Sequence, residues 1–275
     1  PTVFVSGGPM EAGTTVLPDG TVKKNTDLID VMYASADDNL NEEDLLAYEK
    51  TVCPTCGSCA GMFTANSMNC LTEAIGLALP GNGTILASHS YRKDLFKRAA
   101  EQVVKIAKQY YDDDDDSVLP RSIATKKAFE NAMTMDVAMG GSTNTVLHLL
   151  AIAYEAGVPI DLKLFNEISA KTPNLCHLAP AGPTHMPDLY AAGGIPAVQA
   201  ELAKKGLLDL DVPTVTGKTL GENIKGAHIL NDKAIRPIDN PYSQTGGLQI
   251  LWGNIAPDGC VVKRSAVAPE MQQHS

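Results

Sequence analysis

The most constraining feature of the sequence is a loop that carries three cysteines within seven residues, Cys53, Cys56 and Cys59. Pro54 and Gly57 keep this stretch out of regular structure, and a stretch with helical spacing of apolar residues follows it. Thiolates spaced in this way can converge on one soft metal centre, and iron–sulfur clusters are held by such thiolates. The pattern therefore favours a metal site over a disulfide.

The other cysteines do not complete this set. Cys70 is expected on the helix that follows the loop, and Cys176 and Cys260 stand alone, which is typical of small buried apolar residues. A closed zinc site would need a second cysteine pair. Three thiolates are fewer than the four that hold a fully protein-ligated cluster, and an iron with an open position can act as a Lewis acid on a substrate hydroxyl. The alternative is that some of the three thiols only pack or brace the loop.

The composition narrows the class of protein. A net charge of −10 over 275 residues argues against binding of nucleic acid, which needs a basic surface. We expect no membrane span, because no apolar run reaches about 18 residues, and no signal peptide is visible. The crowded cysteines indicate a reducing compartment, so we expect a cytoplasmic enzyme. The chain opens at Pro1 inside an apolar run, and we interpret it as a fragment of a longer protein.

The apolar pattern predicts an α/β fold with a mostly parallel sheet flanked by helices. Residues 3–5 are predicted to be a buried strand and residues 84–87 a second, short strand; residues 14–50 are polar and irregular, with a short helix at 27–32. Longer helices are predicted over residues 62–79, 92–111, 124–138, 143–156 and, with a glycine interruption, 186–204. The helix at 92–111 has one apolar stripe, formed by Phe96, Ala100, Val103, Ala107 and Tyr110.

Two glycine turns are candidate ligand sites. Gly140-Gly141 precedes Ser142, Thr143 and Asn144 at the start of a predicted helix, where free N–H groups and the helix dipole favour an anion. Ordinary N-capping by Ser142 or Thr143 explains the same residues equally well.

Gly7 and Gly8 follow the first predicted strand and allow a ligand to approach the backbone closely, although a plain tight turn explains them too. The histidines carry less information. His148 is predicted at the edge of the core, and His185 at a helix start, where capping is the default role. No pair of histidines has the spacing of a helical metal site, and no nucleophile elbow is present.

Four segments together resemble a known family. They are residues 6–13, 53–68, 131–144 and 253–263, and they are similar, in this order, to the iron–sulfur dihydroxy-acid dehydratase family, which also contains sugar-acid dehydratases such as 6-phosphogluconate dehydratase. The resemblance covers essentially the whole chain. It implies dehydration of a 2,3-dihydroxy carboxylic acid, of the 2,3-dihydroxy-3-methylbutanoate class, to a 2-oxo acid in branched-chain amino-acid biosynthesis.

The resemblance also implies cofactors and site residues. A 2Fe-2S or 4Fe-4S cluster would act as Lewis acid beside Mg²⁺, and the full-length protein would be a homodimer acting on a small dihydroxy-acid. The family element G-x-C-x-x-M matches residues 57–62, so Cys59 is the expected cluster ligand, with Cys56 and Cys53 as further candidates. Ser142, Thr143, Asn144, Gly7 and Gly8 are the expected substrate-binding residues.

The sequence departs from the family by what it lacks. The upstream Asn-Cys-Asp-Lys element, the magnesium carboxylates and the serine base do not occur, so no catalytic residue is assigned in this chain. We expect residues 1–210 to be an incomplete N-terminal α/β domain, 211–253 a crossing segment of that domain, and 254–275 the start of a C-terminal β-barrel-like domain. Such a fragment alone is expected to hold no intact cluster and to be inactive.

Three rival hypotheses stay open at this point. The first is a sugar-acid dehydratase of the 6-phosphogluconate type. The second is a non-catalytic metal-binding or electron-transfer module, which would hold a fully ligated cluster. The third is an apo fold in which the cysteines are structural thiols.

Overall fold

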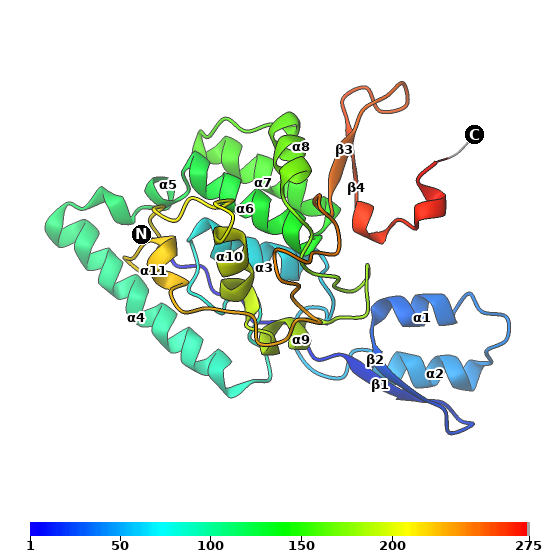
Figure 1. Ribbon diagram of the computed structural model, residues 1–275. Coiled ribbons are helices and arrows are strands. Elements are labelled where there is room, and N and C mark those ends of the chain that lie inside the picture. Colours follow the sequence, from blue (N-terminus) through cyan, green and yellow to red (C-terminus); the bar gives the residue numbers. More distant parts are fainter. Residues whose placement is uncertain (274–275) are drawn as a thin grey trace.

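The computed structural model describes residues 1–273, and helices dominate its regular structure (Figure 1). The helices from α3 to α11 gather into one body, from which a small lobe and a C-terminal hairpin project (Figure 1). The body is built from α3 (Thr64–Ile75), α4 (Ser90–Asp113), α5 (Pro120–Ile123), α6 (Lys126–Met139), α7 (Thr143–Ala156), α8 (Leu162–Lys171), α9 (Met186–Ala191), α10 (Gly194–Ala203) and α11 (Leu220–Asn223). None of the helices in this part of the chain combines the length and the apolar character needed to cross a membrane.

Helix α6 lies at the centre of the body. From Ala128 to Met139 all of its residues except Glu130 are buried, and it contacts α3, α7 and α8. A helix that is covered on all sides is typical of the middle of a core. Two segments of the candidate site described below adjoin these helices: one follows the end of α6, and the other precedes the start of α3.

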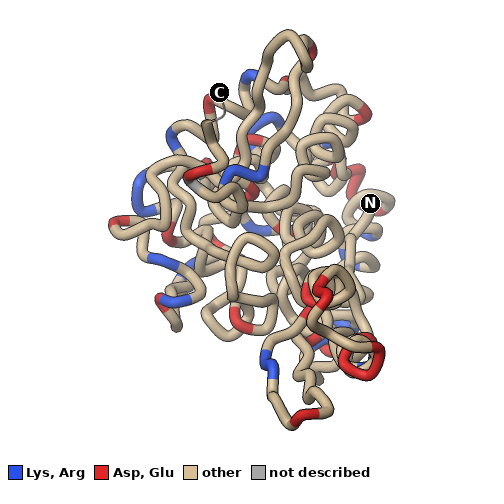
Figure 2. Tube along the Cα trace, turned by 90° about the vertical axis from the view of Figure 1, so that its right-hand side faces the viewer, with Lys and Arg blue, Asp and Glu red and all other residues tan. Residues whose placement is uncertain are grey.

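The lobe is formed by residues 13–52 and has a small apolar core of its own. Its elements are β1 (Gly13–Val16), β2 (Val22–Thr26), α1 (Leu28–Ala34) and α2 (Glu42–Thr51). Leu17, Ala34, Tyr48 and Val52 pack together as a cluster that is separate from the core of the body. Acidic residues gather on this lobe (Figure 2).

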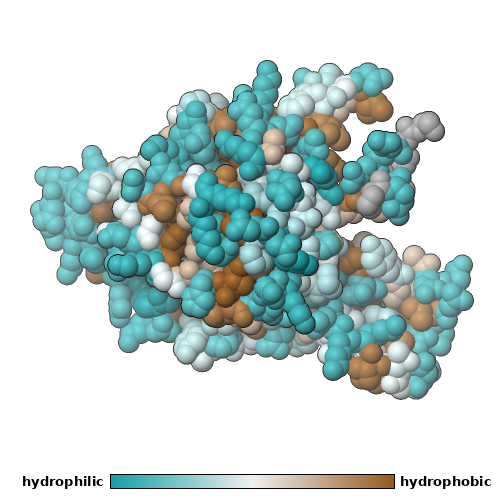
Figure 3. All heavy atoms as spheres, viewed as in Figure 1, coloured by the Kyte–Doolittle hydropathy of each residue, from teal (hydrophilic) through white to brown (hydrophobic). Residues whose placement is uncertain are grey.

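The C-terminal hairpin pairs β3 (Gln249–Leu251) with β4 (Cys260–Val262). In the space-filling view this hairpin and the tail that follows it stand on the same side of the body as the lobe, and a notch separates the two (Figure 3).

The structure does not confirm the predicted parallel sheet. Among residues 1–273 both sheets are two-stranded and antiparallel, β1 with β2 and β3 with β4. Parallel pairing is limited to isolated bridges such as Phe4 with Ala78 and Pro9 with Ser58. The fold is a mixed, helix-rich one.

Two predicted strands are wrong. Residues 3–5 are apolar, yet Phe4 is 49% exposed and Val5 44% exposed, so this run is not a buried strand. Residues 84–87 are turns rather than a strand. Conversely, the polar stretch at 14–50 contains the strands β1 and β2 and the helix α2, in addition to the predicted short helix, which forms as α1.

The predicted long helices are confirmed, but the buried face of α4 is not the predicted one. Phe96 is 42% exposed, and the buried line is Leu95, Ala99 and Ile106, one position away. This line begins with Arg92, whose guanidinium donates to the carbonyls of Ser6 (2.9 Å) and Asn82 (3.1 Å). Because a charged residue lies on the buried face of α4, the apolar pattern of the sequence does not identify that face as the buried one.

Candidate functional site

The cysteine loop is fastened to the first glycine turn. The backbone N–H of Ser58 donates to the carbonyl of Gly8 (3.0 Å), and that of Met10 donates to the carbonyl of Ser58 (2.8 Å). Gly57 has a φ of +125°, and a Cβ at this position would lie 2.7 Å from the carbonyl oxygen of Gly8. Only glycine allows the two segments to approach so closely.

Asn66 clamps the loop from the side of α3. Its fully buried side chain donates to the carbonyls of Cys59 and Gly61, the latter at 2.7 Å, and its Oδ1 accepts from the Ser58 hydroxyl at 2.5 Å. One amide thus satisfies polar groups on both sides of Cys59. The backbone that carries this thiol is therefore held in one conformation.

The three thiols have different environments. Cys53 and Cys56 are exposed, whereas Cys59 is half-buried. Burial raises the pKa of the Cys59 thiol, and negative charge on Cys53 and on Asp27 adds to this rise. A metal would therefore have to displace a proton from Cys59 when it binds.

The donor atoms of this loop suit a soft metal, but they do not form a closed site. Among residues 1–273, no three His, Cys, Asp or Glu side chains converge in a way that could hold a metal ion. The fixed backbone and half-buried thiol of Cys59 suit a single thiolate ligand. The exposed Cys53 and Cys56 do not complete a set around it.

The second glycine turn joins α6 to α7. Gly140 ends α6 with a φ of +82°, and Ser142 caps α7, its hydroxyl accepting from the N–H of Asn144 at 3.3 Å. The predicted capping role of Ser142 is confirmed. Ser142 is buried, while Thr143 and Asn144 are exposed at the start of a helix of 14 residues.

Thr64 brings this turn and the cysteine loop together. It is the first residue of α3, five positions after Cys59, and its Oγ1 lies 3.3 Å from the Ser142 hydroxyl and accepts from the side-chain amide of Asn144 at 2.8 Å. The three segments that the sequence singled out, at Gly8, Cys59 and Ser142, therefore form one hydrogen-bonded unit.

A buried carboxyl group, that of Asp136, and a half-buried lysine, Lys263, support the second turn. Thr145 donates to Asp136 Oδ2, and Lys263, which follows β4, donates to the carbonyl of Gly141 at 2.6 Å. Burial raises the pKa of Asp136 to about 7, and burial lowers that of Lys263 to about 8 despite their mutual attraction. The chain segment after the hairpin is thus anchored on the candidate substrate-binding turn.

A polar pocket of about 220 Å³ lies beside this turn. It shares Gly247 and Ser265 with the surface against which Gly140 packs. Among the described residues, its lining includes Arg264 and no Asp or Glu. In a chain with a net charge of −10, this is a local environment that tolerates an anion.

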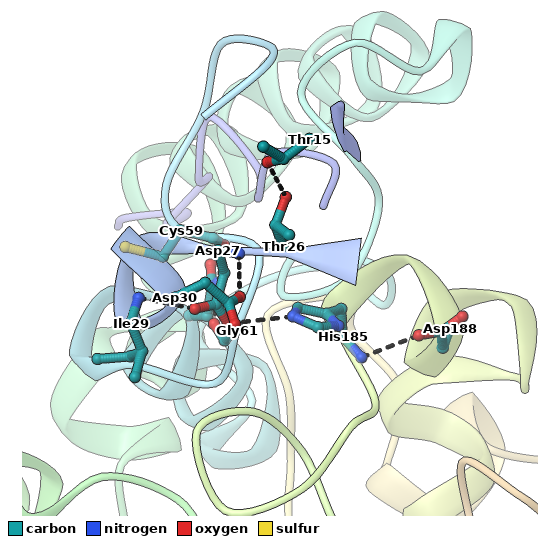
Figure 4. Close-up of polar contacts among 10 residues, drawn as sticks. Thr15, Thr26, Asp27, Ile29, Asp30, Cys59, Gly61, His185 and Asp188 are labelled. Atoms are coloured by element: carbon teal, nitrogen blue, oxygen red, sulfur yellow. Dashed lines mark hydrogen bonds and ion pairs between the residues drawn. The ribbon is translucent and has the colours of Figure 1, made fainter. Parts of the chain in front are cut away.

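A buried histidine–carboxylate contact lies close to Cys59 (Figure 4). His185 Nε2 is 3.1 Å from Asp27 Oδ2, and the two residues are 4% and 6% exposed. Burial opposes the ionisation of Asp27, but the hydrogen bonds from His185 and from the N–H of Ile29 outweigh it and lower its pKa. The predicted position of His185 at a helix start is confirmed, since it precedes α9 and its N–H donates to Asp188 at 2.9 Å.

Sequence reasoning missed most of these supporting residues. Thr64, Asn66 and Lys263 lie inside the recognised motifs, which was the available signal, but nothing local showed which segments they join. Asp136 also lies inside a recognised motif, residues 131–144, whereas Asp27 lies outside all four motifs. A single acidic residue in a helical stretch is normally expected to be exposed, so neither was predicted to be buried.

Comparison of the sequence with known proteins identifies its family. The family model described as "Dihydroxy-acid/6-phosphogluconate dehydratase N-terminal" matches residues 1–223, and its C-terminal counterpart matches residues 233–275. The chain belongs to the dihydroxy-acid/6-phosphogluconate dehydratase family. The resemblance stated from the motifs is thereby confirmed.

Curated members of this dehydratase family are similar along the whole chain. The dihydroxy-acid dehydratase of Bifidobacterium adolescentis is 63% identical over 98% of the chain, and that of Carboxydothermus hydrogenoformans is 56% identical over all of it. The alignments cover 50% and 48% of these two relatives. The chain therefore spans about half the length of the dehydratases it matches.

Proposed function

We propose that this chain is part of an enzyme that dehydrates 2,3-dihydroxy carboxylic acids of the 2,3-dihydroxy-3-methylbutanoate class to 2-oxo acids, as a step of branched-chain amino-acid biosynthesis. In this reaction C2 loses a proton, the hydroxyl leaves C3 as water, and the resulting enol becomes the 2-oxo acid. The observation that carries the proposal is the hydrogen-bonded unit in which Thr64 links the Cys59 loop to the Ser142 turn. The names of the relatives support the same reaction.

Cys59 is the residue that we propose as a ligand of an iron–sulfur cluster, 2Fe-2S or 4Fe-4S, with Cys56 and Cys53 as weaker candidates. When bound, the cluster would supply a Lewis acid for the leaving hydroxyl, with Mg²⁺ assisting. The chain's own contribution is to hold the Cys59 backbone rigid through Asn66 and Ser58. We assign no magnesium ligand to the described residues.

Ser142, Thr143 and Asn144 are proposed to bind the substrate carboxylate. The exposed Thr143 and Asn144 lie at the positive end of the α7 dipole, where free N–H groups favour an anion. Gly7 and Gly8 are proposed to let the substrate approach the backbone beside the cysteine loop. Lys263 is proposed to support the turn without binding substrate, because its ammonium group donates to the carbonyl of Gly141.

The second candidate function is a sugar-acid dehydratase, since the family description covers 6-phosphogluconate dehydratases as well. Both are hydro-lyase reactions on a hydroxylated carboxylate, so the same turn could serve either. Turnover of 2,3-dihydroxy-3-methylbutanoate and of 6-phosphogluconate by the full-length protein separates them. We expect turnover of the first compound, and exclusive turnover of the second would overturn the proposal.

The remaining expectations concern the whole protein. We propose that it is a cytoplasmic homodimer, and the six cysteines, which are all free thiols here, support a reducing compartment. We also keep the proposed division at residues 1–210, 211–253 and 254–275, with a parallel sheet in the complete N-terminal domain. Gel filtration with light scattering on the full-length protein tests the dimer.

A further inference from the structure

The contact between Asp27 and His185 is the polar link between the lobe and the body. Asp27 sits between β2 and α1 of the lobe, and His185 directly precedes α9 of the body. Among hydrogen bonds within residues 1–273, all others made by residues 13–52 stay inside that stretch. The orientation of the lobe therefore depends strongly on this one buried contact.

The lobe is connected along the chain to two segments of the candidate site, the Gly8 turn before it and the cysteine loop after it. It begins at Gly13, shortly after the Gly8 turn, and α2 ends at Thr51, two residues before Cys53. Any rotation of the lobe must move one or both of these attachment points. Because Cys53 lies nearest to the end of α2, its thiol should be displaced most by such a movement.

On the body side, the contact is tied to the backbone that follows Cys59. The N–H of Met186, next to His185, donates to the carbonyl of Ala60 at 2.8 Å. Asp27, on the lobe side, is close enough to Cys59 for its charge to affect that thiol (Figure 4). The cysteine loop is therefore linked to both partners of the contact, to Asp27 through its proximity to Cys59 and to His185 through the hydrogen bond between Met186 and Ala60.

The contact has no substitute in the surroundings. His185 Nδ1 is buried without a hydrogen-bond partner in the described part of the chain, so Nε2 makes the one polar contact of the ring. Removing one partner from a buried pair leaves the other unsatisfied, which is costly.

We propose that Asp27 and His185 are positioning residues that fix the lobe against the body and so set the geometry of the thiols from Cys53 to Cys59. The importance of this geometry for catalysis rests on the proposed function, in which Cys59 binds the cluster. The geometry itself is a property of the metal-free chain.

The test uses the metal-free full-length protein and a set of matched variants. Asp27→Asn removes the charge but keeps an oxygen that can accept from the Ile29 N–H. His185→Gln keeps an amide N–H near the position of Nε2, whereas His185→Asn places its amide near Nδ1 and loses the contact. Asp188→Asn alters the carboxylate that accepts from the backbone N–H of His185 and so weakens the start of α9, but it leaves the side chains of Asp27 and His185 unchanged, and it is the control for helix fraying.

Two readouts are needed, the rate of alkylation of each cysteine by peptide mass spectrometry and amide hydrogen exchange across residues 13–52. We expect His185→Asn and Asp27→Asn to label Cys53 and Cys59 at least about fivefold faster and to exchange faster throughout the lobe. His185→Gln should stay within about twofold of the parent, and Asp188→Asn should change neither readout.

The proposal is overturned if Asp27→Asn and His185→Asn label and exchange like the parent, or if Asp188→Asn reproduces their effect. Should His185→Asn fail to fold, the Asp27→Asn variant decides alone, because it retains the helix cap. Since no cluster or substrate enters these measurements, a wrong assignment of the reaction would show only in turnover assays and would leave this result unchanged.

Discussion

A Cβ on Gly141 would overlap Oδ1 of Asp136. The turn before Ser142 is wrapped around this buried carboxyl group, with no room for a side chain. We predict that Gly141→Ala lowers the free energy of unfolding by about 3 kcal/mol or more, because the turn or α6 must shift. Urea denaturation measures this change.

Gly157 provides the matched control for that substitution. It also follows a helix with a positive φ, +74°, but nothing lies within 4 Å of the Cβ it lacks. Gly157→Ala should cost only about 1 kcal/mol, from the backbone conformation alone. Equal losses in the two variants would contradict the close packing on Asp136.

Asn66 makes the second testable contribution. Truncation by Asn66→Ala leaves the carbonyls of Cys59 and Gly61 and the hydroxyl of Ser58 without their partner. We expect a loss of about 2–4 kcal/mol in thermal or urea unfolding. Asn69→Ala, on the same helix and half-buried, should change stability by less than about 1 kcal/mol, and a similar loss there would argue against a specific clamp.

Asp136 should make stability depend on pH. Its pKa is raised by burial from 3.8 to about 7, so between these values the folded protein holds a proton that the unfolded chain has released. The stabilisation is complete below pH 4 and is lost as pH rises through about 7. Asp136→Asn should reduce the fall in unfolding free energy between pH 5 and 7 by about 2–3 kcal/mol.

Glu73 should keep the unfolding free energy of Asp136→Asn dependent on pH. Burial raises its pKa to about 7 as well, although the N–H groups of Gly81 and Gly83 partly offset this. Some of the slope should therefore remain in Asp136→Asn. A slope identical to that of the parent would show that Asp136 is not the buried proton acceptor described here.

The sequence was most informative where local periodicity decides structure. The helices α3, α4, α6 and α7 follow from apolar spacing, and glycines end α3, α6 and α7. The lobe did not, because β2 has the polar sequence Val22–Thr26 with all but its last residue exposed, and gives no alternating pattern. The exposed Phe4 misled in the opposite direction, as an apolar residue that is not buried.

The candidate site could be predicted in its parts but not in its assembly. The motifs around Gly8, Cys59 and Ser142 named the segments, and the resemblance gave the family. Their connection through Thr64 and the support from Lys263 depend on contacts between residues that are 78 and 122 positions apart. Such contacts follow from packing, which leaves no signal in the local sequence. The metal and substrate roles of these residues stay predictions.

Replacing Cys59 by serine in the full-length protein tests the central claim most directly, with iron content and visible absorbance measured beside turnover of 2,3-dihydroxy-3-methylbutanoate. Cys260→Ser, at an exposed cysteine outside the loop, is the control. We predict that Cys59→Ser loses the iron–sulfur absorbance and at least about 100-fold in turnover while Cys260→Ser keeps both. A Cys59→Ser protein with the full iron content and full turnover would contradict the account.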